Sequence, residues 1–233
     1  QMVGNDFLVR GYEDGKSFTT REKYNPTLFV PSKKRTKYKT LDGKYVQSVK
    51  PGSVRDCREF YRTHGEVKGF EIFGNNRYIY QYISDKYPEK EITFDINKIK
   101  LVTIDIEVKS EKGFPTVQAC DEEMLCITLQ DYATKRILTF GVGPYHHNDP
   151  MVKYVQCNDE YDMLQHFITY WSANPPEVVT GWNCQLYDIA YLAKRITRVL
   201  GEKSCKKLSP WGLVTNEEIY LQGRAHTVYD IGG

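Results

Sequence analysis

Leu101-Val-Thr-Ile-Asp-Ile-Glu-Val108 is the stretch that decides the fold of the second half of this chain. Side chains alternate along a β-strand, so Val102, Ile104 and Ile106 point to one face while Asp105 and Glu107 point to the other. Two carboxylates at this spacing on an apolar strand repel each other unless a cation lies between them. Hard oxygen ligands favour Mg²⁺ or Mn²⁺, so the stretch predicts a divalent metal site. The alternative is a strand end that simply enters solvent.

The composition of the chain is that of a folded protein. Its 233 residues are 40% hydrophobic and 13% aromatic, enough to bury the core of one large or two small domains. No apolar run has membrane-spanning length, and the first residues lack the order of a signal peptide. The six cysteines show no Cys-x-x-Cys spacing, so we expect them to be reduced and none to form a zinc site. We therefore expect a soluble, cytoplasmic protein without a membrane partner.

The net charge of +2 hides an asymmetry between the two halves of the chain. Residues 1–98 hold 19 Lys and Arg against 13 Asp and Glu, whereas residues 99–233 hold 13 against 17. The basic segment Ser32-Lys-Lys-Arg-Thr-Lys-Tyr-Lys39 could lie along a phosphate backbone and gain affinity by releasing counterions. A hairpin that its lysines keep soluble is the alternative.

Residues 1–98 are predicted to form a small, strand-rich α+β domain. Turn and capping signals divide it into two hairpins, a strand and a helix: residues 7–24 around Glu13-Asp-Gly-Lys16, residues 38–46 around Asp42-Gly43, a strand at 26–31, and a helix that begins at Ser53.

Residues 99–233 are predicted to form a second domain with a mixed sheet of α/β type. Strands are expected at 100–108, 123–132, 135–142 and 153–157, with the first three in a meander, and a short buried strand at 178–182. One helix is expected after Asn158, and a second over 186–200 with Lys194, Arg195 and Arg198 on its outer face. Strands followed by helix, strand and helix indicate a sheet with helices packed on it.

Asp188 forms a second acidic position at the start of the second helix. It falls in the first helical turn, close to the positive end of the helix dipole, and Asn183 could cap that turn. An Asp there can simply complement the dipole. Paired with Asp105 and Glu107, however, it predicts that carboxylates from a strand end and a helix start converge on one point.

These motifs resemble the N-terminal and 3′-5′ exonuclease domains of family B DNA polymerases, in particular those of T-even-type bacteriophages and their marine relatives. Asp105-Ile-Glu107 with Gly113-Phe-Pro115 is similar to the family's first exonuclease motif, and Gly181-Trp-Asn183 through Tyr187-Asp188 is similar to the second. Three further stretches resemble the phage proteins in the same order: Asn25-Pro-Thr-Leu-Phe29, Tyr82-Ile-Ser-Asp85 and Lys207-Leu-Ser-Pro210.

The resemblance implies a ribonuclease H-like (DnaQ-like) fold that removes a mispaired nucleotide from a DNA 3′ end with two divalent ions, Mg²⁺ or Mn²⁺. It assigns Asp105, Glu107 and Asp188 as metal ligands and catalytic residues. It also implies that Phe114 stacks on the terminal base and that Asn183 and Tyr187 contact the substrate strand. Core packing is the alternative for Phe114, and a position facing the sheet is the alternative for Tyr187.

The implied partners are a single-stranded DNA 3′ end, primer-template DNA and the rest of a polymerase polypeptide. Residues 206–226 lie where the phage family has a hairpin that separates primer from template, and Thr215-Asn-Glu-Glu218 is expected to form its turn. An ordinary surface hairpin would need only the same residues.

The family's third motif, Tyr-x-x-x-Asp, does not follow Asp188 in this sequence. The chain is therefore expected to stop inside the exonuclease domain, without palm, fingers or thumb, and to have weak or no exonuclease activity alone. Two alternatives stay open. One is a free-standing ribonuclease H-like nuclease, and the other is a nucleic-acid-binding module that binds RNA through residues 1–98.

Overall fold

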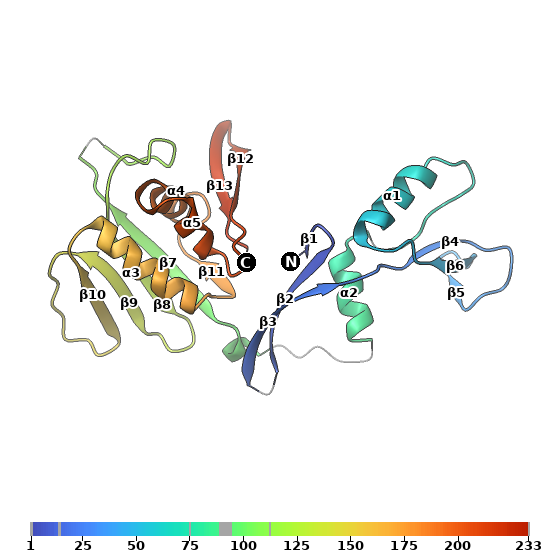
Figure 1. Cartoon of the computed structure of the whole chain (residues 1–233), viewed down its shortest axis with the longest axis horizontal. Helices are drawn as coiled ribbons and strands as arrows, with labels where there is room; N and C mark the ends of the chain where they lie inside the picture. Colours follow the sequence, from blue (N-terminus) through green and yellow to red (C-terminus); the bar gives the residue numbers. More distant parts are fainter. Residues whose placement is uncertain (1, 14, 75, 89–94, 112, 233) are drawn as a thin grey trace. The chain divides into compact units, whose positions relative to one another are not determined.

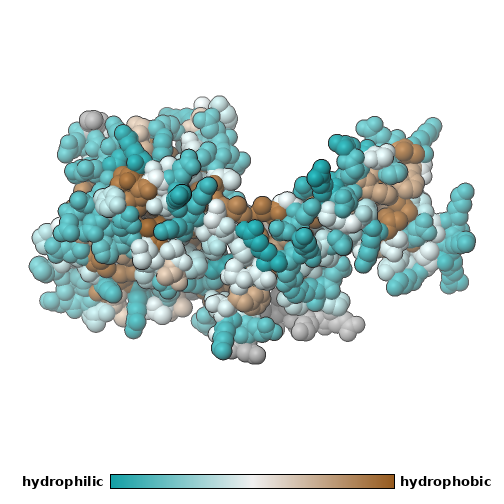
Figure 2. Space-filling model, in the orientation of Figure 1, coloured by the Kyte–Doolittle hydropathy of each residue, from teal (hydrophilic) through white to brown (hydrophobic). Residues whose placement is uncertain are grey.

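The computed structural model of the chain describes residues 2–13, 15–74, 76–88, 95–111 and 113–232. The chain divides into two compact units, Gln1–Phe94 and Asp95–Gly233, which we describe separately (Figure 1). Hydrophilic side chains cover most of the face shown in Figure 2. In the part of the chain that is described, no helix combines the length and apolarity that a membrane span needs.

The first unit contains two small antiparallel sheets and two helices. The first sheet has the order β1-β2-β3 and the second β4-β6-β5. Their bounds are β1 (Met2–Val3), β2 (Asp6–Glu13), β3 (Lys16–Lys23), β4 (Leu28–Pro31), β5 (Tyr38–Lys39) and β6 (Tyr45–Val49), and the helices are α1 (Val54–His64) and α2 (Tyr78–Lys86). Both predicted hairpins are therefore present, although Asp14 of the first predicted turn lies outside the described residues. Ser53 begins α1 in a capping box with Asp56, as its sequence indicates.

A five-stranded mixed sheet forms the centre of the second unit. A short 3₁₀ helix, η1 (Ile96–Lys98), precedes it. The strands are β7 (Leu101–Val108), β8 (Met124–Asp131), β9 (Ile137–Val142), β10 (Val152–Cys157) and β11 (Val178–Thr180). Their order is β10-β9-β8-β7-β11, with β7, β8 and β9 antiparallel and the two outer strands parallel to their neighbours. This confirms the predicted meander and mixed sheet.

Helices α3 (Glu160–Ala173) and α4 (Asp188–Leu200) pack on the apolar face of this sheet (Figure 1). Ile104, Ile127 and Phe140 of the strands share one buried core with Phe167 of α3 and Leu192 of α4. The short helices α5 (Glu202–Cys205) and η2 (Lys206–Leu208) follow α4. The prediction that the strand at 178–182 is buried is wrong. β11 is an edge strand, paired with β7, and both Val178 and Thr180 are exposed because the sheet ends there.

A two-stranded hairpin, β12 (Thr215–Leu221) and β13 (Arg224–Asp230), ends the described chain. The expectation that Thr215-Asn-Glu-Glu218 forms the turn is wrong, because these residues lie within β12. The turn is at Gln222 and Gly223, whose φ angles of 49° and 76° are both left-handed. Polar residues are compatible with a strand here because β12 belongs to a two-stranded ribbon that leaves most of its side chains exposed.

Candidate active site

The end of β7 places the first two acidic side chains as the sequence indicates. Val102, Ile104 and Ile106 are buried on the core face, whereas Asp105 and Glu107 are exposed on the opposite face. The pairing between β7 and β8 shifts by one residue between Glu107 and Val108. An irregularity of this kind next to a site changes the direction of the strand directly after its functional residues.

Asp188 is the first residue of α4, and its side chain is only 3% exposed. The backbone N–H of Ile106 donates a hydrogen bond of 3.2 Å to Oδ1 of Asp188. Strand β11 pairs with β7 only as far as Thr103, so the edge of β7 beyond that point needs another acceptor. Asp188 supplies it at the residue that lies between Asp105 and Glu107, and so brings the third carboxylate to the strand end.

The turn before α4 differs from the predicted cap. Tyr187 is the N-cap residue, and its side chain makes no capping hydrogen bond to the helix. Asn183 instead has a left-handed φ of 57°, and its backbone carbonyl accepts the N–H groups of Leu186 and Tyr187. A Cβ atom on Gly181 would lie 2.4 Å from the carbonyl oxygen of Ile104. Only glycine therefore lets this turn lie directly against β7.

The three carboxylates influence one another electrostatically. Burial raises the pKa of Asp188 above its usual value, and the negative charges of Asp105 and Glu107 raise it further. The N–H groups of Asp188 itself and of Ile106 oppose this by stabilising the carboxylate. The charged form of Asp188 is thus unfavourable in the metal-free chain, and a cation between the three groups would remove the cost.

Replacing Asp188 by Asn is therefore expected to stabilise the metal-free chain. A native pKa above the unfolded value means that folding stability falls as the pH rises through the native pKa. Asn removes the charge and keeps an oxygen for the Ile106 N–H, so we expect a gain of about 0.5–2 kcal/mol at pH 7. Urea unfolding in EDTA measures this gain. It should shrink as the pH falls to about 3.9, the unfolded pKa of Asp, and a gain independent of pH would contradict the assignment.

The donor set of Asp105, Glu107 and Asp188 fits a hard divalent ion, since it offers only carboxylate oxygens. Among the described residues, however, the group of three that brings its ligand atoms within 4.8 Å of one another is a different one, Cys157, Asp162 and His166. Asp105, Glu107 and Asp188 are not such a group among the described residues. All six cysteines are free thiols.

An aromatic pair, exposed Phe114 and half-buried Tyr187, lies beside the acidic site. The ring of Phe114 is 79% exposed, which excludes the alternative of core packing. Its centroid lies 5.4 Å from the ring of half-buried Tyr187, which is in turn 5.6 Å from the ring of Tyr191. Trp182, in the turn before Asp188, is 94% exposed and was not predicted as a site residue. A large apolar residue next to Gly181 and Asn183 in a turn is the sequence signal that could have identified it.

Helix α4 fixes the loop that connects Phe114 to β8 through a row of side-chain donors. Four donors bond three backbone carbonyls of this loop: Tyr191 Oη to Glu122 (2.8 Å), Lys194 Nζ to Gln118 (2.5 Å), and Arg195 Nη1 (3.1 Å) and Arg198 Nη1 (2.8 Å) both to Cys120. Cys120 has a left-handed φ of 47°, which turns its carbonyl toward the helix. The helix that carries Asp188 therefore also positions the loop that carries Phe114.

Arg195 contradicts the expectation that it faces solvent. Its side chain is buried and forms a two-point ion pair with buried Glu160, at 2.6 Å from Nε to Oε1 and 2.7 Å from Nη2 to Oε2. Glu160 Oε1 also accepts the backbone N–H of Met124 at 2.9 Å. Arg195 lies next to the buried residues of α4, and its side chain turns inward to pair with Glu160 of α3.

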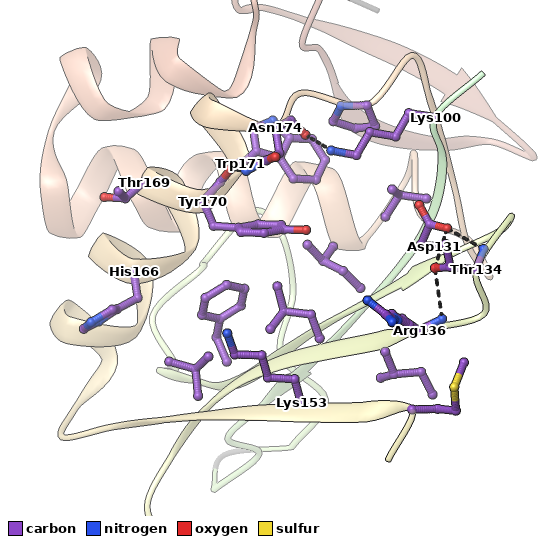
Figure 3. A pocket seen from close by; sticks show the side chains of 18 of the residues that line it. Lys100, Asp131, Thr134, Arg136, Lys153, His166, Thr169, Tyr170, Trp171 and Asn174 are labelled. Atoms are coloured by element: carbon purple, nitrogen blue, oxygen red, sulfur yellow. Dashed lines mark hydrogen bonds between the residues drawn. The ribbon is translucent and has the colours of Figure 1, made fainter. Parts of the chain in front are cut away.

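A cavity of about 910 Å³ lies elsewhere in this unit, between α3 and the core face of the strands (Figure 3). Tyr170 and Trp171 of α3 line it together with Lys100, Asp131 and Arg136 from the ends of the sheet. Asp105 and Glu107 belong to the opposite face of β7, so this cavity is separate from the acidic site.

Comparison with protein families identifies the family of the chain. Residues 72–233 match the model of the exonuclease domain of DNA polymerase family B. The chain belongs to this family. The matched region begins in the first unit, before α2, and includes all three acidic residues, the aromatic pair and the hairpin of β12 and β13.

Relatives of this family B exonuclease chain include two phage polymerases. The DNA-directed DNA polymerase of Enterobacteria phage T4 is 30% identical over 260 aligned residues, which cover 100% of this chain and 28% of the relative. That of Escherichia phage RB69 is 27% identical and covers 90% of this chain and 26% of the relative. The DNA polymerase catalytic subunit of Psittacid herpesvirus 1 is 24% identical over 54% of this chain. The chain spans less than a third of the length of these relatives.

Proposed function

We propose that this chain supplies the 3′-5′ exonuclease site of a replicative family B DNA polymerase, acting in the cytoplasm of an infected bacterial cell. One observation carries the proposal: Asp188 is hydrogen-bonded to Ile106, the residue between Asp105 and Glu107, in a chain that matches the exonuclease domain of this family. We place the exonuclease domain at residues 99–233 and a separate N-terminal domain at residues 1–98.

The three carboxylates would hold two divalent ions, Mg²⁺ or Mn²⁺, at the end of β7. When bound, such a pair activates the attacking water and stabilises the leaving 3′ oxygen. Asp105 would anchor both ions, Glu107 would orient the water, and Asp188 would hold the second ion. Asp188 is suited to this task because the hydrogen bond that its Oδ1 accepts from the Ile106 N–H fixes the orientation of its carboxylate.

Phe114, Tyr187 and Asn183 would bind the substrate, the single-stranded 3′ end of a primer-template DNA. The exposed face of Phe114, supported by Tyr187, offers a stacking surface for the terminal base whatever its identity. Asn183 is exposed in the turn before α4, where its side-chain amide would be free to contact the substrate strand. Sequence-tolerant stacking suits an editing site because any of the four bases can be mispaired.

The test of the proposal combines two measurements. Mn²⁺ binding to the chain is titrated first, and the chain is then mixed with a polypeptide that carries the remaining polymerase sequence and assayed for Mg²⁺-dependent 3′-5′ digestion and synthesis. We expect saturable Mn²⁺ binding and a gain of digestion on mixing. A chain that binds no Mn²⁺ and a mixture that stays inactive would overturn the proposal.

Replacing Phe114 by Ala is expected to weaken the binding of a single-stranded oligonucleotide about 5- to 150-fold, since base stacking contributes roughly 1–3 kcal/mol per base. Fluorescence anisotropy in Ca²⁺ or EDTA measures binding without cleavage. Tyr161→Ala, which removes an exposed aromatic ring from α3, is the matched control and should leave the affinity unchanged. Equal losses in the two variants would show that Phe114 has no specific stacking role.

The first unit supports RNA binding as a second candidate function. Lys37 lies 4.9 Å from the ring centroid of Tyr38, and Lys39 lies 5.1 Å from that of Tyr45, so basic and aromatic groups alternate on one small sheet. Such a surface attracts phosphates and stacks bases. RNA binding that weakens with salt but ignores chelators would favour this function over the exonuclease.

A further inference from the structure

Three different metal-binding side chains meet where β10 joins α3. Cys157 is the last residue of β10, and Asp162 and His166 lie on consecutive turns of α3. One ligand atom from each lies within 4.8 Å of the other two. Residues four apart on a helix project from the same face, and Cys157 precedes the helix closely enough to complete the group. Against the expectation from cysteine spacing that no cysteine forms a zinc site, we propose that these three residues bind a transition-metal ion, Zn²⁺ or a chemically similar ion such as Co²⁺.

The three residues become progressively more exposed from the core toward solvent. Cys157 is 2% exposed, Asp162 is half-buried and His166 is exposed. Figure 3 shows His166 on α3 at the far end of the cavity from Lys100 and Asp131. An ion can therefore enter from the solvent side of His166 while the sulfur binds it from the core side.

The carboxylate of Asp162 is already oriented for this role. Its Oδ2 accepts hydrogen bonds of 3.0 Å from both the backbone N–H and the side-chain amide of Asn158. Its Oδ1 lies 3.0 Å from Nδ1 of His166. Outer partners that hold a carboxylate in this way favour metal binding because less rotamer freedom is lost when the ion binds. Binding would release the proton of the Cys157 thiol and leave His166 neutral.

The chemistry of the donors selects the ion. A sulfur, an imidazole nitrogen and a single carboxylate suit Zn²⁺ or Co²⁺, whereas Mg²⁺ requires hard oxygen ligands. Three protein ligands leave a fourth position for water. Strands β9 and β8 separate β10 from β7, so the site lies about 14 Å from Asp105 along the sheet, given a strand spacing of roughly 4.8 Å. The two metal sites are thus distinct in both ligand type and position.

Titration of the whole chain with Co²⁺ in excess Mg²⁺ tests the proposal. We expect visible absorption bands of four-coordinate Co²⁺ together with a thiolate-to-cobalt band. Cys157→Ser should abolish the thiolate band, and His166→Gln, a change at an exposed position, should weaken Co²⁺ binding at least about tenfold. Cys126→Ser, on β8, and Asp188→Asn should leave both the band and the affinity unchanged.

The controls separate this proposal from the proposed function. A thiolate band that survives in Cys157→Ser, or an affinity that is the same in His166→Gln and wild type, would overturn the site. Loss of Co²⁺ binding in Asp188→Asn alone would place the ion at the acidic site instead. Zn²⁺ should also raise the urea midpoint of wild type and not that of His166→Gln, because the ion joins β10 to α3 in the native state only.

Discussion

Replacement of Asp105 by Asn is expected to lower the rate of metal-dependent 3′-end digestion at least about a thousandfold in the mixture with the remaining polymerase polypeptide. A metal pair contributes several kcal/mol of charge stabilisation in the transition state, and each 1.36 kcal/mol is a factor of ten in rate. Asp105 is the exposed carboxylate before Ile106, so the change removes a proposed ion ligand without touching the buried face of β7. Release of a labelled 3′-terminal nucleotide measures the rate.

Two controls keep this expectation specific. Glu217→Gln neutralises an exposed carboxylate on β12 and should leave both the rate and Mn²⁺ binding unchanged. The urea midpoint of Asp105→Asn should not fall below that of wild type, because the substitution is nearly isosteric and lies at the surface. If Asp105→Asn binds Mn²⁺ as tightly as wild type, Asp105 is not a metal ligand.

Replacement of Arg195 by Met is expected to destabilise the second unit by about 3–5 kcal/mol, the usual cost of breaking a buried ion pair. The change leaves the Glu160 carboxylate buried without its cation and also removes donors to the Cys120 carbonyl. The free energy of unfolding of a domain is roughly 5–15 kcal/mol, so the substitution should remove a large part of it. Urea unfolding measures the loss, monitored by the fluorescence of Trp171, which is buried in the core of the second unit.

An exposed ion pair in the same unit provides the comparison. Lys109 and Glu123 also form a close contact, at 2.5 Å, but both side chains are more than a third exposed. Lys109→Met should change the urea midpoint far less than Arg195→Met does, because solvent screens the charges of the exposed pair. A second measurement concerns position rather than stability: oligonucleotide binding should weaken in Arg195→Met even at low urea, since the loop that carries Phe114 loses one of its anchors. Equal costs for Arg195→Met and Lys109→Met would contradict the role of burial.

Local patterns in the sequence predicted the strands and helices of the second unit well. The alternation along residues 101–108 identified which side chains of β7 enter the core, and the confirmed meander followed from three such segments. Local patterns predicted the secondary structure less well where the same residues suit two conformations. The polar stretch at 215–218 fits a turn and an exposed strand equally, and only the left-handed pair at Gln222 and Gly223 decides between them.

The amino-acid sequence by itself determined that Asp105 and Glu107 share the polar face of a core strand, because that depends only on the two-residue period of a strand. It also carried the motifs that placed the chain in its polymerase family. The sequence predicted that Asp188 meets these carboxylates, but only the tertiary structure shows how: its carboxylate accepts the Ile106 N–H, on the edge of β7 where β11 stops pairing after Thr103. The tertiary structure likewise decided that Arg195 is buried, since Glu160 comes from another helix. Both depend on contacts between segments far apart in the chain, which no local period encodes.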